Sequence, residues 1–343
     1  MTLSREGQCV AFLSRIGWGA ARRTALAGDA SDRRYERLIR GPEAGEDRAV
    51  LMDAPPGQGD DPADFIRIGD HLASLGLSPP RILARDLAQG FLLLEDLGDD
   101  LVARVVARAP ERTLPLYRLA VDVLIHLQRH PAPPGLPNLS CQDWADAAGF
   151  APDWYGFAAT GTAPDSRAFR AELAGLLAGH ADGPRVLILR DYHAENLLDL
   201  PGRSGLAALG LLDFQQGQMG QPGYDLVSLL QDARRDVPLA VEASLLRHFA
   251  NQTGQDLAAF STAYAVLGAQ RALRILGVFS RLCLKGGKAG YLPLLPRVWA
   301  QLQRNLAHPA LAALKAECDR LLPPPTPEII ARIGAQCGTQ PRR

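Results

Sequence analysis

Short apolar runs are frequent in about the first hundred residues, whereas the rest of the chain mostly has apolar residues three or four positions apart. Short runs are typical of strands, and the wider spacing is typical of helices. The N-terminal part therefore predicts a small sheet beside two helices, one at 3–16 and one beginning at Asp61-Pro62, a capping residue followed by a first-turn proline. The strands of this sheet are expected at 22–27, 34–40, 48–53, 81–84 and 91–95.

Helical spacing dominates from residue 113 onward. One long helix is predicted around 116–127 and another at 263–284, both as core elements. Two short apolar runs, 186–189 and 209–212, are interpreted as buried strands within this helical part. The sequence therefore predicts the α+β class, with a small sheet part followed by a larger, mainly helical part.

An acidic residue follows each of these two buried runs. Asp191 follows the first and Asp213 the second, so each carboxylate lies where a strand opens into a loop, and Asn196 comes five residues after Asp191. Magnesium prefers hard oxygen ligands, and phosphoryl transfer from ATP uses a carboxylate that accepts the proton of the acceptor hydroxyl. The pattern predicts Asp191 as the catalytic base and Asn196 and Asp213 as ligands of Mg²⁺, with ATP as the phosphate donor.

Two unrelated surface turns would contain the same residue types, because loops are rich in Asp and Asn. The strand before each Asp, and the Tyr224-Asp225 pair that opens an apolar helix downstream, favour the phosphotransfer interpretation.

These residues resemble a known family. The segment from Asp191 to Asn196 matches the Asp-x-x-x-x-Asn catalytic loop of the protein-kinase-like fold, and residues 213–215 stand where that fold has Asp-Phe-Gly, with Gln215 replacing Gly. Over nearly its whole length the chain resembles the aminoglycoside phosphotransferase and choline kinase superfamily. It is most similar there to the anomeric kinases of N-acetylmuramate and N-acetylglucosamine in cell-wall recycling, through the stretches 52–56, 90–98, 190–193 and 224–232.

The resemblance implies a protein-kinase-like fold of two lobes. A small nucleotide-binding lobe with an antiparallel sheet would span 1–98, including a hinge at 95–98, and a helical catalytic and acceptor-binding lobe would span 99–343. It also implies a bacterial, cytoplasmic enzyme that releases a sugar 1-phosphate. Alternatives left open are another small-molecule kinase of the superfamily, acting on an aminoglycoside, choline or another sugar, and a nucleotide-binding pseudokinase.

The same resemblance indicates which residues contact the nucleotide. Main-chain groups of the hinge normally recognise adenine in this fold, and a turn at 28–34 would bring backbone amides over the phosphates. This turn is not a Gly-x-Gly-x-x-Gly loop, and an ordinary hairpin turn would look the same. The nucleotide-binding residues expected from the two segments are Gly28, Ala30, Ser31, Arg34, Glu95 and Leu97.

The third predicted strand departs from the kinase pattern. Met52 stands near the place of the lysine that pairs with the nucleotide phosphates, and the chain has no lysine before Lys285. Arg34 or Arg48 could neutralise charge instead, or both could be solvated strand residues. Loss of the lysine is also expected of an inactive relative, although retention of the base and both metal ligands favours activity.

Further residues are candidates for acceptor binding or for support of the loop. His193 and Glu195 lie inside the catalytic loop, where His193 is expected to act as a scaffold more than as a second base. Asp143 and Trp144 belong to a polar and aromatic cluster of the kind that binds sugars, and a packed helical surface would contain the same residues. Asp225 resembles the buried carboxylate that supports the catalytic loop in this fold.

A carboxylate on the acceptor, such as the lactyl group of N-acetylmuramate, would favour a nearby arginine. The candidates for this role are Arg234, Arg235 and Arg271.

Composition narrows the function classes. Lys plus Arg equals Asp plus Glu at 37 each, so no excess positive field argues for nucleic acid or an anionic membrane, and a small molecule is the expected partner. Polycationic aminoglycosides would need an acidic cleft, and residues 143–165 contain carboxylates but no dense cluster of them. A chain with 6% aromatic residues could supply a choline site, but no pattern in the sequence indicates one. No obligate protein partner is indicated.

Cysteines and the N-terminus bear on the compartment. Five scattered cysteines without Cys-x-x-Cys spacing disfavour a zinc site or a disulfide framework. The first residues lack a basic segment followed by an apolar stretch. A soluble, cytoplasmic protein is therefore expected.

Overall fold

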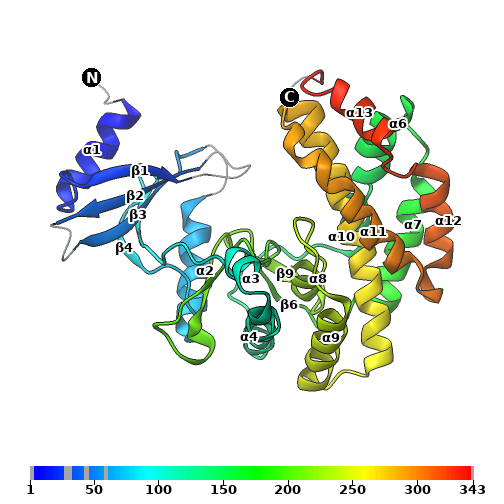
Figure 1. Ribbon diagram of the computed structural model, residues 1–343, viewed down its shortest axis with the longest axis horizontal. Coiled ribbons are helices and arrows are strands. Elements are labelled where there is room, and N and C mark those ends of the chain that lie inside the picture. The colour runs from blue at the N-terminus through cyan, green and yellow to red at the C-terminus, as the bar shows by residue number, and fades with distance from the viewer. Residues whose placement is uncertain (1–3, 27–32, 42–45, 58–60, 341–343) are drawn as a thin grey trace. The chain divides into compact units, whose positions relative to one another are not determined.

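The computed structural model describes residues 4–26, 33–41, 46–57 and 61–340 (Figure 1). Helices and one antiparallel five-stranded sheet make up most of the described chain, which confirms the predicted α+β class.

Contacts divide the chain into two compact units. Unit 1 comprises Met1–Val123 and Ala194–Gly217, and unit 2 comprises Leu124–His193 and Gln218–Arg343. Unit 1 thus continues past residue 98 to Val123 and takes in the later segment 194–217, and the division into functional lobes at residue 98 stays a prediction.

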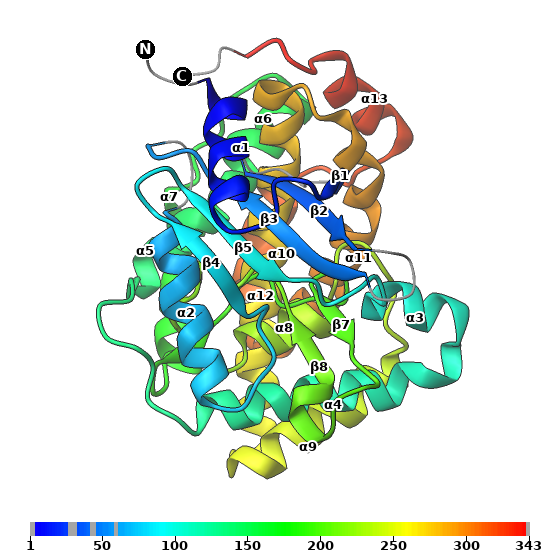
Figure 2. The same cartoon turned by 90° about the vertical axis from the view of Figure 1, so that its left-hand side faces the viewer.

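Unit 1 is built around the antiparallel sheet, whose strand order is β1-β2-β3-β5-β4 (Figures 1 and 2). Tyr35 pairs with Met52 across β2 and β3, and Met52 pairs with Leu92 across β3 and β5. All five predicted strands are present near their expected positions. Their bounds are β1 Arg22–Leu26, β2 Arg34–Arg40, β3 Asp47–Asp53, β4 Ile82–Asp86 and β5 Phe91–Glu95.

Helix α1 (Arg5–Arg15) packs on this sheet. Its apolar side turns Phe12 towards β5, where the Phe12 and Phe91 rings stack with centroids 5.5 Å apart. Ser4 caps the helix by accepting the Gly7 N–H. The other buried members of this core cluster are Cys9, Leu13, Trp18, Leu38, Ala49, Leu51 and Leu93.

Helix α2 (Pro62–Ser74) begins where the sequence predicts. The Asp61 side chain accepts the Ala63 N–H at 2.8 Å, so the cap satisfies a helix N–H that has no partner within the helix. Phe65, Ile68 and Leu72 recur at helical spacing and are buried.

The rest of unit 1 contains two helices and a short hairpin. These elements are α3 Val102–Arg108, most of α4 Thr113–Gln128, β7 Leu197–Asp199 and β8 Leu209–Leu211. Isolated bridges join Leu101 to Leu198 and Ser78 to Gly210. These bridges fasten the hairpin to the segments around it, which explains why residues 194–217 belong to unit 1.

Unit 2 is mainly helical, and the thirty-residue helix α10 (Leu257–Gly286) contacts most of its other helices. The predicted helix at 263–284 lies within it. Two short strands, β6 Val186–Ile188 and β9 Gln218–Gly220, pair antiparallel. The remaining α-helices are α5 Cys141–Ala148, α6 Phe157–Thr160, α7 Arg167–Leu176, α8 Tyr224–Leu230, α9 Leu239–Thr253, α11 Leu295–Leu306, α12 Ala312–Leu321 and α13 Pro327–Ala335. Short π-helical segments lie at Ala151–Gly156 and Leu177–Ala181, and 3₁₀ turns at Ala289–Leu294 and Pro309–Leu311.

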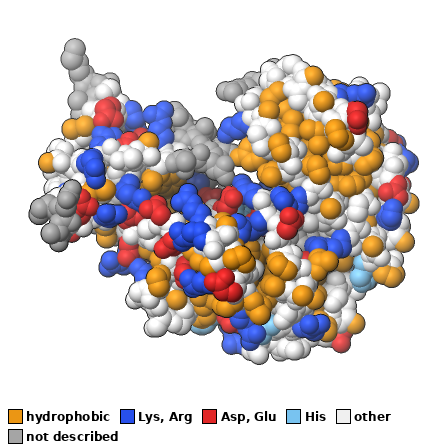
Figure 3. All heavy atoms as spheres, in the orientation of Figure 1, with side chains coloured by type: hydrophobic (Ala, Val, Ile, Leu, Met, Phe, Trp, Pro, Cys, Tyr) orange, Lys and Arg blue, Asp and Glu red, His pale blue; other side chains and the backbone are white. Residues whose placement is uncertain are grey.

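The equal numbers of basic and acidic residues are reflected in the charges on the surface. On the face drawn in Figure 3, basic and acidic side chains are interspersed, and hydrophobic side chains gather over the C-terminal helices of unit 2. Within the described ranges, no helix combines the length and the apolarity that a bilayer crossing needs.

Candidate active site

The loop that carries Asp191 leaves β6 in unit 2. Leu187, Ile188 and Leu189 are buried, and Arg190 then adopts a φ of 71°, in the left-handed region that non-glycine residues rarely occupy. The turn at Arg190 ends the strand and leaves Asp191 partly exposed. A strained residue directly before a candidate base is the kind of feature that active sites retain.

Asp225 holds the backbone of this loop. Its carboxylate, fully buried at the start of α8, accepts the Leu189 N–H at 2.6 Å and the Arg190 N–H at 2.9 Å. The Ser228 hydroxyl donates to the Arg190 carbonyl, so the turn is held from both sides. Burial raises the pKa of Asp225 to about 7, against the lowering effect of the two N–H groups. These contacts match the supporting role expected for Asp225.

Arginine side chains surround His193 in the same loop. His193 is 5% exposed, and its Nε2 atom lies 3.4 Å from Nη1 of Arg234. Because a guanidinium can only donate, Nε2 must accept, which leaves the proton of a neutral ring on Nδ1. Burial, followed by the charges of Arg234, Arg271 and Arg235, lowers the pKa of His193 to about 3. A neutral ring engaged in this way suits a scaffold better than a second base.

Asn196 and Asp213 lie in unit 1, at one end of the β7–β8 hairpin. Asn196 comes directly before β7, and its carbonyl accepts the Leu212 N–H at 2.9 Å. Leu197 pairs with Leu211, so the strand pairing itself brings the two predicted magnesium ligands to the same end of the hairpin. Asp213 has a φ of 54°, which Asp adopts more readily than most residues.

Gln215 and Arg33, both in unit 1, contact the Asp213 carboxylate. Gln215 Nε2 donates to Oδ1 at 2.8 Å, and Nη2 of Arg33 lies 3.5 Å from the same oxygen. The Asp213 side chain is 44% exposed, whereas the Arg33 side chain is 5% exposed. The carboxylate therefore faces a buried cation on one side and is open to solvent or ligand on another.

Phe214 fixes the segment that follows Asp213. Its ring stacks on Phe65 of α2, with centroids 4.8 Å apart, and its edge lies 3.5 Å from where a Cβ atom would stand on Gly69. The Asp-Phe-Gln motif is thus anchored to α2 through its aromatic residue.

The donor set suits magnesium held with a nucleotide. Among the described residues there is no group of three or more His, Cys, Asp and Glu side chains that could hold a metal ion. Mg²⁺ is usually bound by one or two protein oxygens together with substrate phosphates and water, and not by an all-protein cage. One carboxylate and one amide, from Asp213 and Asn196, fit that mode of binding.

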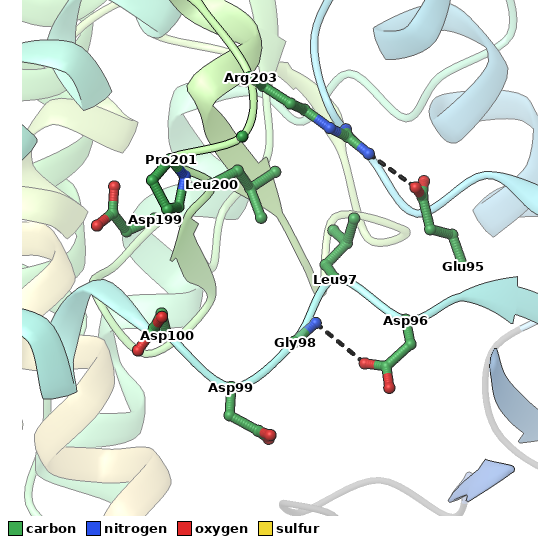
Figure 4. A pocket seen from close by; sticks show the side chains of 11 residues that line it. Glu95, Asp96, Leu97, Gly98, Asp99, Asp100, Asp199, Leu200, Pro201 and Arg203 are labelled. Atoms are coloured by element: carbon green, nitrogen blue, oxygen red, sulfur yellow. Dashed lines mark hydrogen bonds and ion pairs between the residues drawn. The ribbon is translucent and has the colours of Figure 1, made fainter. Parts of the chain in front are cut away.

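The hinge borders a cavity of about 320 Å³ in unit 1 (Figure 4). Glu95 and Leu97 line it, as does the 199–203 segment that follows β7. Arg203 pairs with Glu95 at 2.8 Å. Burial raises the pKa of Glu95, but the ion pairs with Arg81 and Arg203 outweigh it and hold this pKa below its usual value. Both predicted hinge residues thus face a pocket, and their contact with nucleotide stays a prediction.

Two predicted acceptor residues have structural partners in unit 2. Asp143 forms a capping box with Ser140 at the start of α5. Its carboxylate accepts the Ser140 hydroxyl at 2.7 Å and the Ser140 N–H at 2.8 Å, and these bonds lower its pKa. Trp144 is 2% exposed and packs on Tyr224, with ring centroids 4.7 Å apart. These roles in folding explain both residues without a sugar, so neither is included among the groups proposed below.

The predicted phosphate-contacting residues are only partly described. Gly28, Ala30 and Ser31 lie outside the described residues. Arg34 is exposed, and Arg48, which has a side chain 55% exposed, pairs with Glu46. Of the three arginines around β2 and β3 named here, only Arg33 contacts Asp213. Sequence reasoning did not single out Arg33.

A family model and a named relative both match most of this chain. The model of the phosphotransferase enzyme family matches residues 22–262. A relative from Caulobacter vibrioides, named N-acetylmuramate/N-acetylglucosamine kinase, is 39% identical, with 94% of this chain and 99% of the relative covered.

Solved structures show the same fold at low sequence identity. A choline kinase from Cryptosporidium parvum has a TM-score of 0.56 at 10% identity and covers 91% of this chain and 96% of its own. An ADP-bound aminoglycoside phosphotransferase has a TM-score of 0.54 at 12% identity, with coverage of 85% and 95%. The predicted family resemblance and the fold that it implied are confirmed.

Proposed function

Because the chain belongs to the phosphotransferase enzyme family, we propose that it is an ATP-dependent kinase that phosphorylates the anomeric hydroxyl of N-acetylmuramate and N-acetylglucosamine. The choice of acceptor is supported by the Caulobacter relative, whose name states these two sugars and whose similarity extends over 94% of this chain. The observation that carries the chemistry is the fixed Asp191 loop, whose backbone is bonded to the buried carboxylate of Asp225.

In the proposed reaction the anomeric hydroxyl oxygen of the sugar attacks the γ-phosphorus of ATP. A new P–O bond forms while the bond from the γ-phosphorus to the bridging oxygen breaks, and ADP leaves with that electron pair. The hydroxyl proton passes to the Asp191 carboxylate. A positioned general base typically contributes about 10²- to 10⁴-fold to the rate. The products are a sugar 1-phosphate and ADP.

Charge neutralisation is assigned to the hairpin of unit 1. The side-chain oxygens of Asn196 and Asp213 would hold Mg²⁺, which would supply positive charge to offset that of the phosphates. Gln215 and Arg33 hold the Asp213 carboxylate from the protein side. His193 stays neutral and bonded to Arg234, so the proton is assigned to Asp191 alone.

The test is ADP release from MgATP with separate acceptors: N-acetylmuramate, N-acetylglucosamine, glucose, choline and an aminoglycoside. Turnover is expected with the two N-acetyl sugars. Asp191→Asn should lower kcat by about 10²- to 10⁴-fold and leave the dissociation constant of MgADP within about threefold. The matched control is Asp236→Asn in the same unit, since the Asp236 side chain is 80% exposed and should leave kcat unchanged.

Two outcomes would contradict this function. Full activity of Asp191→Asn would remove Asp191 as the base. Binding of ATP without phosphate transfer to any acceptor would instead favour the nucleotide-binding pseudokinase that the missing strand lysine leaves open.

A further inference from the structure

Met52 stands near the place in the third strand at which protein kinases carry a phosphate-binding lysine. Its side chain is fully buried, and its strand partners are Tyr35 on one side and Leu92 on the other. An apolar residue in that place supplies no charge, so the charge that offsets the phosphates is expected from a different residue.

Strand register singles out one arginine. Arg34 pairs with Asp53 and Tyr35 pairs with Met52. Paired residues of an antiparallel sheet share a face, and faces alternate along each strand. Continuing the alternation one residue beyond β2 places residue 33 on the face of Met52 and Arg34 on the face of Asp53. Asp53 is itself bonded to Arg5 of α1, so the Arg34 face is turned towards that helix.

The contacts agree with this assignment. The Arg33 guanidinium lies 3.5 Å from Oδ1 of Asp213, and the Arg33 side chain is 5% exposed. Taking a guanidinium out of water is costly unless an anion or strong acceptors compensate. The Asp213 carboxylate is such an anion, and it retains 44% exposure through which a ligand can approach.

We propose that Arg33 takes over the role of the missing third-strand lysine: it orients Asp213 and binds the phosphates of ATP. This inference rests on the proposed kinase function. A guanidinium presents several donors in a planar fork that fits phosphate oxygens, so its geometry is suited to bind two oxygens where an ammonium acts as a point charge.

Nucleotide binding in the absence of sugar tests the proposal. MgATP would be titrated calorimetrically into the unaltered chain, Arg33→Met, Arg33→Lys and Arg34→Met, and adenosine binding would be read by ligand-observed NMR. Arg33→Met should weaken MgATP binding by roughly 10- to 100-fold, the effect of losing a charge-assisted bond, and leave adenosine binding within about threefold. Arg33→Lys should recover part of the loss because it restores the charge.

Arg34→Met tests the competing assignment of Arg34 to the nucleotide that the sequence predicts. Because Arg34 is exposed and pairs with Asp53 on the opposite face of the sheet from Met52, the inference expects this variant to bind MgATP like the unaltered chain. A merely structural role of Arg33 would weaken adenosine and MgATP binding together, and that result would overturn the proposal. Equal losses in Arg33→Met and Arg34→Met would do the same. If Arg33→Met does not fold, Arg33→Lys decides the test. This variant should bind MgATP more weakly than Arg34→Met does, with its affinity for adenosine unchanged.

Failure of the proposed function is distinguishable from failure of this inference. A chain that binds MgATP through Arg33 but phosphorylates no amino sugar supports the inference and contradicts the function. Turnover with amino sugars that is unaffected in Arg33→Met, with unaffected MgATP binding, contradicts the inference alone. A chain that does not bind MgATP overturns both.

Discussion

Gly90 lies at the turn into β5, and its replacement by alanine tests how closely two segments of unit 1 pack. Its φ is 72°, in the left-handed region. A Cβ atom on Gly90 would stand 1.9 Å from the carbonyl oxygen of Ala54 and 2.9 Å from the carbonyl carbon. The Ala54 N–H donates to the Gly90 carbonyl at 2.9 Å, so the two backbones cannot separate without loss of that bond.

These distances set the size of the effect. The left-handed conformation costs an alanine about 1–2 kcal/mol relative to glycine. The clash of the added methyl group with Ala54 should cost about another 1–3 kcal/mol, as overpacking does. The reduced freedom of the unfolded chain returns about 0.4–1 kcal/mol, which is too small to compensate. Gly90→Ala should therefore lower the free energy of unfolding by roughly 2–4 kcal/mol, read from urea denaturation followed by circular dichroism.

Two other glycines serve as controls because they separate the causes. Gly76 has nearly the same φ, 74°, but no atom lies within 4 Å of a Cβ built there, so Gly76→Ala should lose only about 1 kcal/mol. Gly175 lies in α7 with open space around it, and Gly175→Ala should gain about 0.5–1 kcal/mol from helix propensity. A loss in Gly90→Ala no larger than that in Gly76→Ala would refute the role of the clash.

Two further predictions concern Arg234 and the neighbouring His193. Arg234→Ala should raise the KM for N-acetylmuramate about tenfold and leave that for N-acetylglucosamine within about threefold, because only the former carries a carboxylate that a guanidinium can pair with; equal changes with both sugars would contradict this. His193 has a pKa of about 3, so its NMR signals should not titrate between pH 5 and 8. His193 takes up its proton near the ordinary pKa of 6.5 in the unfolded chain and near 3 in the folded chain. This group therefore makes the free energy of unfolding fall as the pH drops from about 6.5 towards 3. Replacement by asparagine should flatten that slope, and a His193 titration near pH 6.5 would show that the ring is not held as described.

The elements around the candidate site were predictable because contiguous residues encode them. An apolar run followed by a turn is visible without any tertiary information, and the runs before Asp191 and Asp213 correspond to β6 and β8 in the structure. The pairing of Leu197 with Leu211 then brings Asn196 and Asp213 to one end of the hairpin, which the spacing alone could not show. The catalytic and metal-binding roles of these residues stay predictions.

Composition alone could not separate two roles for Asp143 and Trp144, because one residue type serves several purposes. Asp143 was interpreted as a sugar ligand, yet Ser140-x-x-Asp143 is a capping-box pattern, and the structure has that box. Trp144 was grouped with it as an aromatic wall, and it lies in the core against Tyr224. The capping pattern was present in the sequence and indicates the structural role of Asp143, whereas sugar binding by either residue stays a prediction.

Arg33 could not be found from local pattern at all, because its partner Asp213 lies 180 positions away. Only strand register distinguishes it from Arg34, and register depends on which residue of β2 faces Met52. A shift by one residue would exchange the two faces and make Arg34 the buried arginine.

The absence of a strand lysine therefore says less about activity than the sequence alone suggested. This chain has only three lysines, Lys285, Lys288 and Lys315, among 37 basic residues, so arginine supplies nearly all of its positive charge. A chain of that composition would be expected to neutralise phosphate with arginine whether or not it is active. Because an arginine side chain is longer than a lysine side chain and ends in a planar fork, it can reach the same phosphates from a different position of the backbone. A cation beside Asp213 is retained in this chain, because the Arg33 guanidinium lies 3.5 Å from its carboxylate.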